Sequence, residues 1–289
     1  MDTPSHLYKY TSADTAKVVL STGCLRWSSP EIFNDPAEFR RLPSFEPSLV
    51  DSIPQVPRLV VAAAAGDSTI DVERLCAPTR QLYDLVSWAI SQGMKAEDFL
   101  DEHEEDRALD AIYHERLREF FGENFTKQAR VLCLTANPLN PAMWANYAQS
   151  HAGCLLGFKH LPELSTPLQE AKRVTYHETA PLIGSGLDFL LYGDSKELRE
   201  RTIDYICFAK KAEWQYEQEW RVITWRSNEG HSLHGDYPFF PDELESLTFG
   251  LRASDDDVND LTALTRSKYP ACSVFRVVSE HGELKRVRA

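Results

Sequence analysis

The stretch that decides the fold runs from Tyr216 to Trp225 and reads YEQEWRVITW. Its second half, Trp220–Trp225, is typical of a β-strand, because Trp, Val, Ile and Thr suit a pleated, half-buried surface. Side chains alternate along a strand, so Glu217, Glu219 and Arg221 are expected on one face. Tyr216, Gln218, Trp220 and Val222 are expected on the other. Two interpretations stay open: a solvated face on which Arg221 neutralises a neighbouring acid, or the strand of an active site.

The composition predicts a packed globular protein. Apolar residues make up 43% of the 289 residues, and no apolar run approaches the length of a membrane helix. The N-terminal MDTPSHLYKY lacks the basic and apolar regions of a signal peptide. The net charge of −13 disfavours an extended nucleic-acid surface, although a small site for one nucleotide stays possible. We therefore expect a cytoplasmic protein with no membrane partner.

Cysteine spacing and sequence motifs exclude several familiar sites. The six cysteines are scattered without a C-x-x-C pair, which indicates free thiols in a reducing compartment. The histidines lack metal-ligand spacing, so no metal site is expected. Neither G-x-x-x-x-G-K-[ST] nor G-x-G-x-x-G occurs, and G-x-S-x-G and H-E-x-x-H are also missing.

The order of the expected elements indicates an α+β fold. Strands are expected at Leu7–Tyr10 and Val131–Thr135, and they should join Trp220–Trp225 in one β core. Helices interrupt this frame rather than alternate with the strands, as in SADTAKVVLSTG, which Ser12 caps and Gly23 ends. A final helix, ASDDDVNDLTALTRSKY, begins with three aspartates, which suit the positive end of its dipole.

We expect a single domain over residues 1–289. Residues 60–128 are predicted to form a mostly helical insertion packed on the β core, because DVERLCAPTRQLYDLVSWAISQG and RALDAIYHERLREFF carry apolar residues at helical spacing. The acidic AEDFLDEHEED between them is interpreted as a solvated connection, with a metal site as the alternative. NPLNPAMWANYAQSHAG is expected to form a loop and a short helix.

Four motifs closely resemble an uncharacterised bacterial domain family. They are LYKY near the N-terminus, the FNDP loop, the MWANYA block with its following H-x-G and GF, and W-x-x-E-x-E-W-R. This resemblance covers most of the chain and implies no chemistry by itself.

Three blocks in series also resemble the ADP-ribosyltransferase superfamily. YKYT followed by STGCL is similar to its first strand, helix and second strand; MWANYAQSHAGCLLGF is similar to the middle segment of the poly-ADP-ribose branch; and YEQEWRVI is similar to its catalytic strand. The resemblance implies an ADP-ribosyltransferase-like mixed β core and NAD as substrate. Glu219 then takes the position of the catalytic glutamate, and Glu217 that of the first acid in the Q/E-x-E pair of arginine-modifying members.

The remaining site residues follow from the chemistry that the resemblance implies. Breaking the nicotinamide–ribose bond develops oxocarbenium character, which one carboxylate stabilises while a second takes a proton from the acceptor. Lys9 would meet the adenosine ribose or the pyrophosphate, and Arg221 would hold the acids. Asn34 and Asp35 are interpreted as turn formers, or alternatively as a loop over the pocket.

The sequence departs from the superfamily at two positions. Lys9 replaces a histidine or arginine, and Cys133 replaces the tyrosine that stacks on nicotinamide. The aromatic face would then come from Trp27, Trp144 or Tyr147. The structural alternative makes Trp144 and Tyr147 core residues and makes the Glu217–Arg221 contact a surface pair worth under about 1 kcal/mol.

The expected function is therefore an NAD-dependent modification of an unknown macromolecular acceptor, by analogy in a toxin or an anti-phage effector. Two alternatives stay open. One is a non-catalytic domain of the same fold that binds a nucleotide or a protein, and the other is a metal-dependent hydrolase or nuclease that uses the acids around Glu219.

Overall fold

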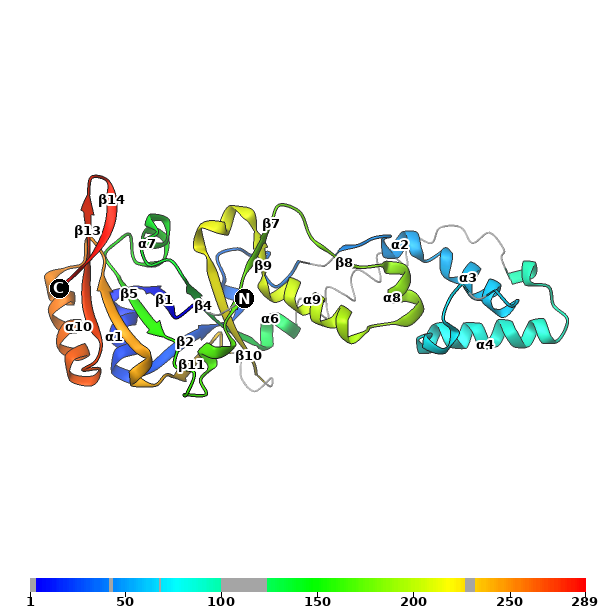
Figure 1. The fold of residues 1–289 in the computed structure, drawn as a ribbon, viewed down its shortest axis with the longest axis horizontal. Coiled ribbons are helices and arrows are strands. Elements are labelled where there is room, and N and C mark those ends of the chain that lie inside the picture. The colour runs from blue at the N-terminus through cyan, green and yellow to red at the C-terminus, as the bar shows by residue number, and fades with distance from the viewer. Residues whose placement is uncertain (1–3, 42–43, 68, 100–123, 227–231) are drawn as a thin grey trace. The chain divides into compact units, whose positions relative to one another are not determined.

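The computed structural model describes residues 4–41, 44–67, 69–99, 124–226 and 232–289 (Figure 1). The chain divides into two compact units, the first comprising residues 1–38, 125–178 and 208–289 and the second comprising residues 39–124 and 179–207. The protein mixes helices and strands and contains a large mixed sheet. Within the described part of the chain, no helix combines the length and the apolarity that a bilayer crossing requires.

A ten-stranded sheet dominates the described residues of the first unit, in the order β11-β2-β4-β1-β5-β12-β13-β14, with β10 on β4 and β6 on β10. Pairing is antiparallel except between β12 and β13, which the crossover helix α10 connects. The strands are β1 (His6–Thr11), β2 (Cys24–Ser28), β4 (Ala129–Thr135), β5 (Cys154–Lys159), β6 (Lys172–Arg173), β10 (Glu219–Trp225), β11 (His234–Pro238), β12 (Leu244–Phe249), β13 (Ser273–Glu280) and β14 (Glu283–Arg288).

The sheet confirms that the three strands predicted from sequence belong to one β core. Strand β10 pairs with β4 along its whole length, from Glu219 opposite Thr135 to Trp225 opposite Ala129. By contrast, β1 and β2 each meet β4 at a single pair, Tyr8 with Thr135 and Ser28 with Val131. The sheet therefore splits where β1 and β2 leave β4.

Two helices cover one face of this sheet, α1 (Ala13–Thr22) and α10 (Asp255–Lys268). Ser12 caps α1 and Gly23 ends it in the left-handed conformation, as predicted. Lys17 of α1 pairs with Asp257 and Asp260 of α10 at 3.1 and 3.3 Å. The hydroxyl of Tyr269 donates to the Leu20 carbonyl at 3.0 Å, which ties the end of α10 to α1.

The opposite face of β1 and β5 packs against α7 (Pro141–Tyr147), the short helix expected after the NPLNP loop. Three residues with positive φ follow this helix, at Gln149, Ser150 and His151 (φ 51°, 51° and 70°). The left-handed turn ends at Gly153, where a Cβ atom would overlap the Thr11 carbonyl oxygen. The MWANYAQSHAG block is thus a tightly packed corner of the fold.

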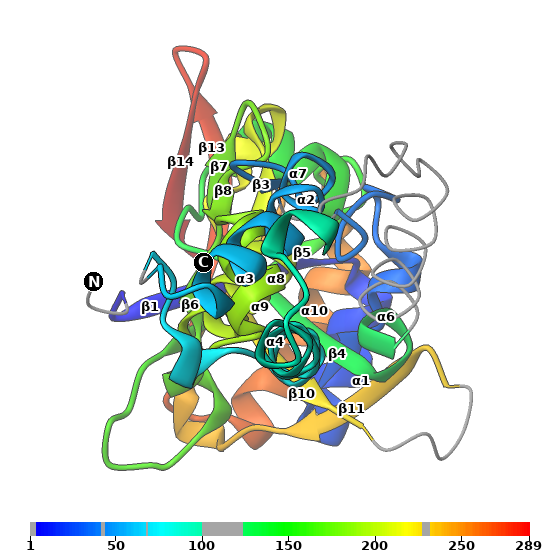
Figure 2. The ribbon, with the colours of Figure 1, turned by 90° about the vertical axis from the view of Figure 1, so that its right-hand side faces the viewer.

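Shorter elements complete the first unit. Strand β7 pairs in parallel with β9 in a separate two-stranded sheet, and β13 and β14 form a hairpin that projects from the edge of the large sheet (Figures 1 and 2). These elements are η1 (Pro30–Ile32), α6 (Asn124–Gln128), η5 (Pro167–Glu170), β7 (Thr175–His177), β9 (Ala209–Lys211), η6 (Ala212–Glu217) and η7 (Pro241–Glu243).

The described residues of the second unit are mainly helical, with a two-stranded sheet of β3 and β8. An apolar cluster that includes Val60, Val86 and Leu191 joins α3, α4 and α8. The elements are β3 (Ser44–Phe45), α2 (Leu49–Ser52), α3 (Gln55–Ala64), η2 (Val72–Arg74), α4 (Ala77–Ser91), η3 (Ala96–Phe99), β8 (Leu182–Gly184), α8 (Gly186–Tyr192) and α9 (Lys196–Phe208).

The described parts of residues 60–128 include α3, α4 and η3. The helix expected in RALDAIYHERLREFF and most of the acidic AEDFLDEHEED lie outside the described residues. The packing of this segment on the β core and the treatment of residues 1–289 as one domain stay predictions.

Candidate functional site

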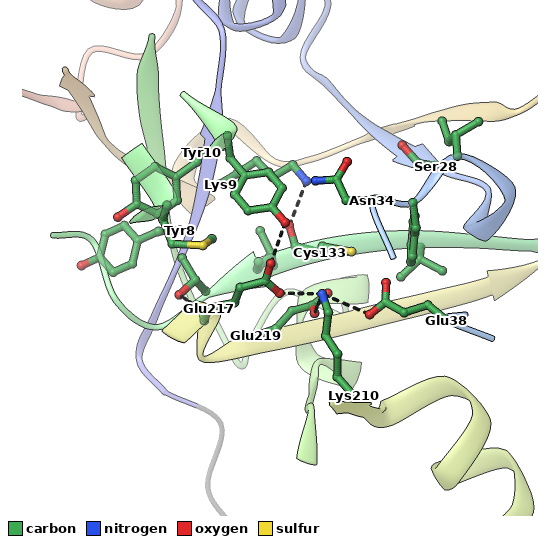
Figure 3. A pocket seen from close by; sticks show the side chains of 17 residues that line it. Tyr8, Lys9, Tyr10, Ser28, Asn34, Glu38, Cys133, Lys210, Glu217 and Glu219 are labelled. Atoms are coloured by element: carbon green, nitrogen blue, oxygen red, sulfur yellow. Dashed lines mark hydrogen bonds and ion pairs between the residues drawn. The ribbon is translucent and has the colours of Figure 1, made fainter. Parts of the chain in front are cut away.

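A cavity of about 180 Å³ lies at the point where β1 and β2 leave β4 (Figure 3). Its wall includes Tyr8, Lys9 and Tyr10 of β1, and it includes Cys133 and Thr135 of β4. An engineered cavity of roughly 150 Å³ takes up benzene. This cavity is therefore large enough for one aromatic ring, and any larger ligand would extend beyond it.

The two glutamates of the opening stretch both line this cavity. Strand β10 begins at Glu219, and alternation places Glu219 and Arg221 on the opposite face from Trp220, as predicted. The predicted strand position of Glu217 is wrong, because Glu217 is the last residue of η6. Gln218 separates it from the strand and adopts the left-handed conformation (φ 46°). The chain thus brings the two carboxylates together through a turn rather than through strand alternation.

Hydrogen bonds from neighbouring elements fix this turn. The Thr135 hydroxyl donates to the Glu217 carbonyl at 2.6 Å, and the Tyr176 hydroxyl accepts the Glu219 N–H at 2.8 Å. Asn140, which also caps α7, donates its side-chain amide to the Tyr216 carbonyl at 2.7 Å. The backbone that carries both acids is therefore held by β4, β7 and α7.

Arg221 lies behind the cavity and is completely buried. Its Nε and Nη2 atoms reach Glu219 Oε1 and Oε2, each at 2.8 Å, and Nη2 also reaches Glu38 Oε1 at 2.6 Å. Glu217, Glu219 and Arg221 are 3%, 5% and 0% exposed, so the surface-pair interpretation is wrong.

Lys210, on β9, completes a buried cluster of charges (Figure 3). Its Nζ atom lies 2.6 Å from Glu217 Oε2, 3.1 Å from Glu38 Oε1 and 3.3 Å from Glu219 Oε2. The ammonium also lies 4.7 Å from the centre of the Trp214 ring, within the range of a cation–π contact. We call Glu38, Lys210, Glu217, Glu219 and Arg221 the charge cluster.

The pKa values of the two catalytic candidates shift in opposite directions in the folded protein. Burial alone would raise the pKa of Glu219, but Arg221 and Lys210 outweigh burial and lower it to about 2. Burial raises the pKa of Glu217 above its ordinary value, and Lys210 only partly offsets that effect. Two carboxylates whose environments separate their pKa values are suited to different roles in acid–base chemistry.

Three other predicted residues line the cavity, namely Lys9, Asn34 and Tyr147. Lys9 donates from Nζ to the Cys133 carbonyl at 2.9 Å and so bridges the split between β1 and β4. The Tyr147 hydroxyl donates to Glu217 Oε1 at 2.6 Å. Burial and the nearby Glu217 charge raise the pKa of Tyr147, so it remains a donor at neutral pH.

The remaining predicted residues do not line this cavity. Trp144 is fully buried in the core, where its Nε1 donates to the Pro138 carbonyl at 3.1 Å, so its expected aromatic face toward a ligand is wrong. Trp27 is likewise buried and packs on Tyr237. Asp35 accepts the Ala37 N–H at 2.9 Å, as a turn former does, and lines a separate open groove.

Sequence reasoning missed two members of the charge cluster and part of the aromatic wall. Lys210 is one of two adjacent lysines, and nothing in FAKKAEW distinguishes the buried one from Lys211. Glu38 follows the FNDP motif and looks like any surface acid. Tyr8 and Phe33 also line the cavity. They lie within the LYKY and FNDP motifs, and these motifs were the sequence signal that could have placed both residues in the site.

The described residues contain no group of three or more His, Cys, Asp and Glu side chains arranged to hold a metal ion. The three carboxylates of the charge cluster surround an ammonium group instead, because Lys210 occupies the space between them. All six cysteines have free thiols, as predicted.

A comparison with known families matches a segment that carries part of the site. Residues 143–222 match the model of a family described as "Protein of unknown function (DUF2971)". The matched segment runs from α7 to β10 and includes Tyr147, Lys210, Glu217, Glu219 and Arg221, whereas the LYKY and FNDP motifs lie outside it. Neither the curated proteins nor the solved structures contain a significant match to the chain.

Proposed function

We propose that the cavity binds the nicotinamide end of NAD and that the protein is an ADP-ribosyltransferase-like enzyme acting on a macromolecule. The single observation that carries the proposal is the meeting of Lys9, Tyr147, Glu217 and Glu219 around one cavity where the sheet splits. The blocks that resemble the superfamily are far apart in sequence, yet each contributes to this wall. The size of the cavity suits one aromatic ring, and Tyr8 and Phe33 offer aromatic surface for it.

The proposed reaction breaks the bond between C1′ of the ribose and the nicotinamide nitrogen. Nicotinamide leaves with the bonding electron pair, and an acceptor oxygen or nitrogen forms the new bond to C1′. Glu219, ionised because of its low pKa, stabilises the positive charge that develops on the ribose. Glu217, with its higher pKa, takes the proton that the acceptor releases.

Glu219 can still accept a hydrogen bond from a ribose hydroxyl, although Arg221 and Lys210 already donate to its two oxygens. A carboxylate has about four acceptor positions, and Arg221 and Lys210 use about three of them. A hydrogen bond to the Cys133 thiol also lowers the pKa of Glu219. A thiol is a weak donor, so a ribose hydroxyl would displace it readily.

One alternative keeps the same ligand without catalysis. The bidentate contact with Arg221 already neutralises Glu219, which leaves less of its charge to stabilise a transition state. This observation favours a domain that binds a nucleotide and does not cleave it. The metal-dependent hydrolase is less well supported, because a metal ion would have to displace Lys210 from the three carboxylates.

The test is calorimetric titration with NAD, combined with chromatographic measurement of released nicotinamide. We expect the wild-type protein to bind NAD and release nicotinamide, and we expect Tyr147→Phe to slow release about 10-fold because it frees Glu217 Oε1. Glu280→Gln, an exposed change on β13, is the matched control. Binding without release identifies the non-catalytic alternative, and a lack of NAD binding overturns the proposal.

A further inference from the structure

Lys210 contacts all three carboxylates of the charge cluster, which no other described residue does. Arg221 reaches Glu219 and Glu38, and Tyr147 reaches Glu217 alone. Lys210 therefore connects Glu217 to the two acids that pair with Arg221. The Lys210 side chain is 6% exposed, so water contributes little to holding it in place.

The geometry of Glu217 depends on two donors. Tyr147 donates to Oε1 and Lys210 donates to Oε2, each at 2.6 Å. Two donors on different oxygens fix the plane of the carboxylate, because rotation would break both contacts. Tyr147 comes from α7 and Lys210 from β9, so the orientation depends on two independently anchored elements.

The charges around Glu217 make Lys210 the main group that stabilises the ionised form of Glu217. The charge cluster holds three carboxylates and two cationic groups, and Arg221 forms its ion pairs with Glu38 and Glu219. The other titratable groups that act on Glu217 are Glu219 of β10 and the hydroxyl of Tyr147. Tyr176 of β7 and Tyr216 of η6 also lie within the electrostatic range of Glu217. Lys210 is the only cation that contacts Glu217 among the described residues.

We propose that Lys210 is a positioning residue, which keeps Glu217 ionised and aims it into the cavity beside Glu219. The effect of Lys210 on catalysis rests on the proposed function. Its effect on the charge and orientation of Glu217 rests on the contacts alone. Lys210 does not reach the reacting atoms in this role. It acts through Glu217, whose free lone pairs would receive the proton from the acceptor.

The test measures the titration of Glu217 and the pH dependence of nicotinamide release in Lys210→Gln. The Glu217 carboxyl is followed by ¹³C NMR in the intact protein and assigned from its disappearance in Glu217→Gln. Removing an opposite charge at this distance should raise the midpoint of Glu217 by about 1–3 pH units. The acidic limb of the release profile should move upward by the same amount.

Two further variants make the result specific. Lys210→Arg retains the charge and should restore most of the wild-type midpoint, whereas Lys285→Met removes an exposed lysine that also pairs with a glutamate at 2.7 Å and should leave the midpoint of Glu217 unchanged. If Lys210→Gln does not fold, Glu38→Gln takes its place. That change removes a competing acid from Lys210 and should lower the midpoint.

The two readouts separate the two proposals. An unchanged Glu217 midpoint in Lys210→Gln, or a midpoint that does not fall in Glu38→Gln, overturns the role of Lys210. A wild-type protein that neither binds NAD nor releases nicotinamide overturns the proposed function, while the NMR titration still decides whether Lys210 controls Glu217.

Discussion

Arg221 and Glu219 lie two residues apart on one face of β10 and form a bidentate ion pair, with both N–O distances at 2.8 Å. The planar guanidinium matches the two carboxylate oxygens, and this geometry gives strength and fixes direction. Both side chains are buried, and Arg221 also holds Glu38. The opening stretch of sequence thus encodes the centre of a buried charge cluster at the wall of a cavity.

The first prediction concerns the removal of the central cation. We expect Arg221→Met to lower the free energy of unfolding by about 3–5 kcal/mol, because it leaves Glu219 and Glu38 as buried charges with fewer partners. Arg221→Lys should recover only part of this loss, since an ammonium cannot make the bidentate contact. Denaturant unfolding followed by circular dichroism measures both effects.

The control is an exposed pair of the same type. Arg26 contacts Asp236 at 3.1 Å, and the two side chains are 49% and 54% exposed. Arg26→Met should change the free energy of unfolding by less than about 1 kcal/mol. Equal losses in Arg26→Met and Arg221→Met would contradict a special contribution of the buried cluster.

The second prediction is a loss of stability in acid. The pKa of Glu219 falls from 4.5 to about 2 in the folded protein, so its contribution is fully present above pH 4.5 and disappears as the pH falls toward 2. The shift corresponds to about 3 kcal/mol. The pKa of Glu217 is raised, so its effect has the opposite sign: the cost of its buried charge decreases as the pH falls through the folded pKa and is gone below the unfolded pKa.

This acid effect is measured as the difference between wild-type protein and Glu219→Gln in denaturant unfolding at pH 5, 4 and 3. The gap between the two proteins should narrow across this range, because Glu219 takes up a proton in the unfolded wild-type chain below pH 4.5 while it stays ionised in the folded protein until the pH approaches 2. Carboxylates outside the charge cluster titrate alike in both proteins and cancel in the difference. A constant gap from pH 5 to pH 3 would rule out the low pKa of Glu219.

The strands and helices that frame the site follow from local sequence patterns. The run of Trp, Val, Ile and Thr in WRVITW predicted β10, and Ser12 with Gly23 predicted the limits of α1. The grouping of Glu219 with Arg221 followed from strand alternation. These features depend on neighbours in the sequence, so one sequence is enough to predict them.

The burial of the charged residues depends on contacts between distant segments and was not predictable in the same way. Glu38 meets Arg221 across 183 residues, and Lys210 reaches the cluster because β9 pairs with β7. Trp144 lies in the core rather than in the cavity wall, where its ring meets Tyr10 edge-on and its Nε1 donates to the Pro138 carbonyl. An aromatic residue on a short helix can lie either in the core or in a cavity wall, and only the folded structure shows which.

The third prediction concerns the backbone corner behind α7. The Gly250 N–H donates to the Gly153 carbonyl at 2.9 Å, and a Cβ atom at Gly250 would overlap the His151 carbonyl oxygen. We expect Gly250→Ala to lower the free energy of unfolding by about 1–3 kcal/mol, the usual cost of overpacking. A thermal melt would show a clear decrease in Tm.

Gly282→Ala separates this steric effect from backbone strain. Gly282 has a φ of +84°, and no atom lies within 4 Å of the position that a Cβ would take, so alanine there is strained without a clash. It should cost about 1–2 kcal/mol from backbone strain alone. A Gly250→Ala protein as stable as the wild type would show that the corner can relax.

The fourth prediction separates the roles of the two glutamates. Under the proposed function, Glu219→Gln should reduce nicotinamide release at least about 10²-fold with and without an acceptor, because the charge that stabilises the ribose is lost. Glu217→Gln should impair transfer to an acceptor and retain some hydrolysis, where water accepts the ribose. Both are measured by nicotinamide release and acceptor labelling in the same sample.

Stability measurements on Glu219→Gln and Glu217→Gln show whether each glutamate has a chemical role or a structural one. Glu219→Gln leaves Arg221 and Lys210 with one fewer anion and should cost about 3 kcal/mol, because both cations are buried. Glu217→Gln should cost less, since its raised pKa shows that burial already disfavours its charge and glutamine can still accept from Tyr147. Activity is therefore compared at a temperature where both variants are folded by circular dichroism. Wild-type nicotinamide release by folded Glu219→Gln would refute its catalytic role and leave the ion pair with Arg221 as its function.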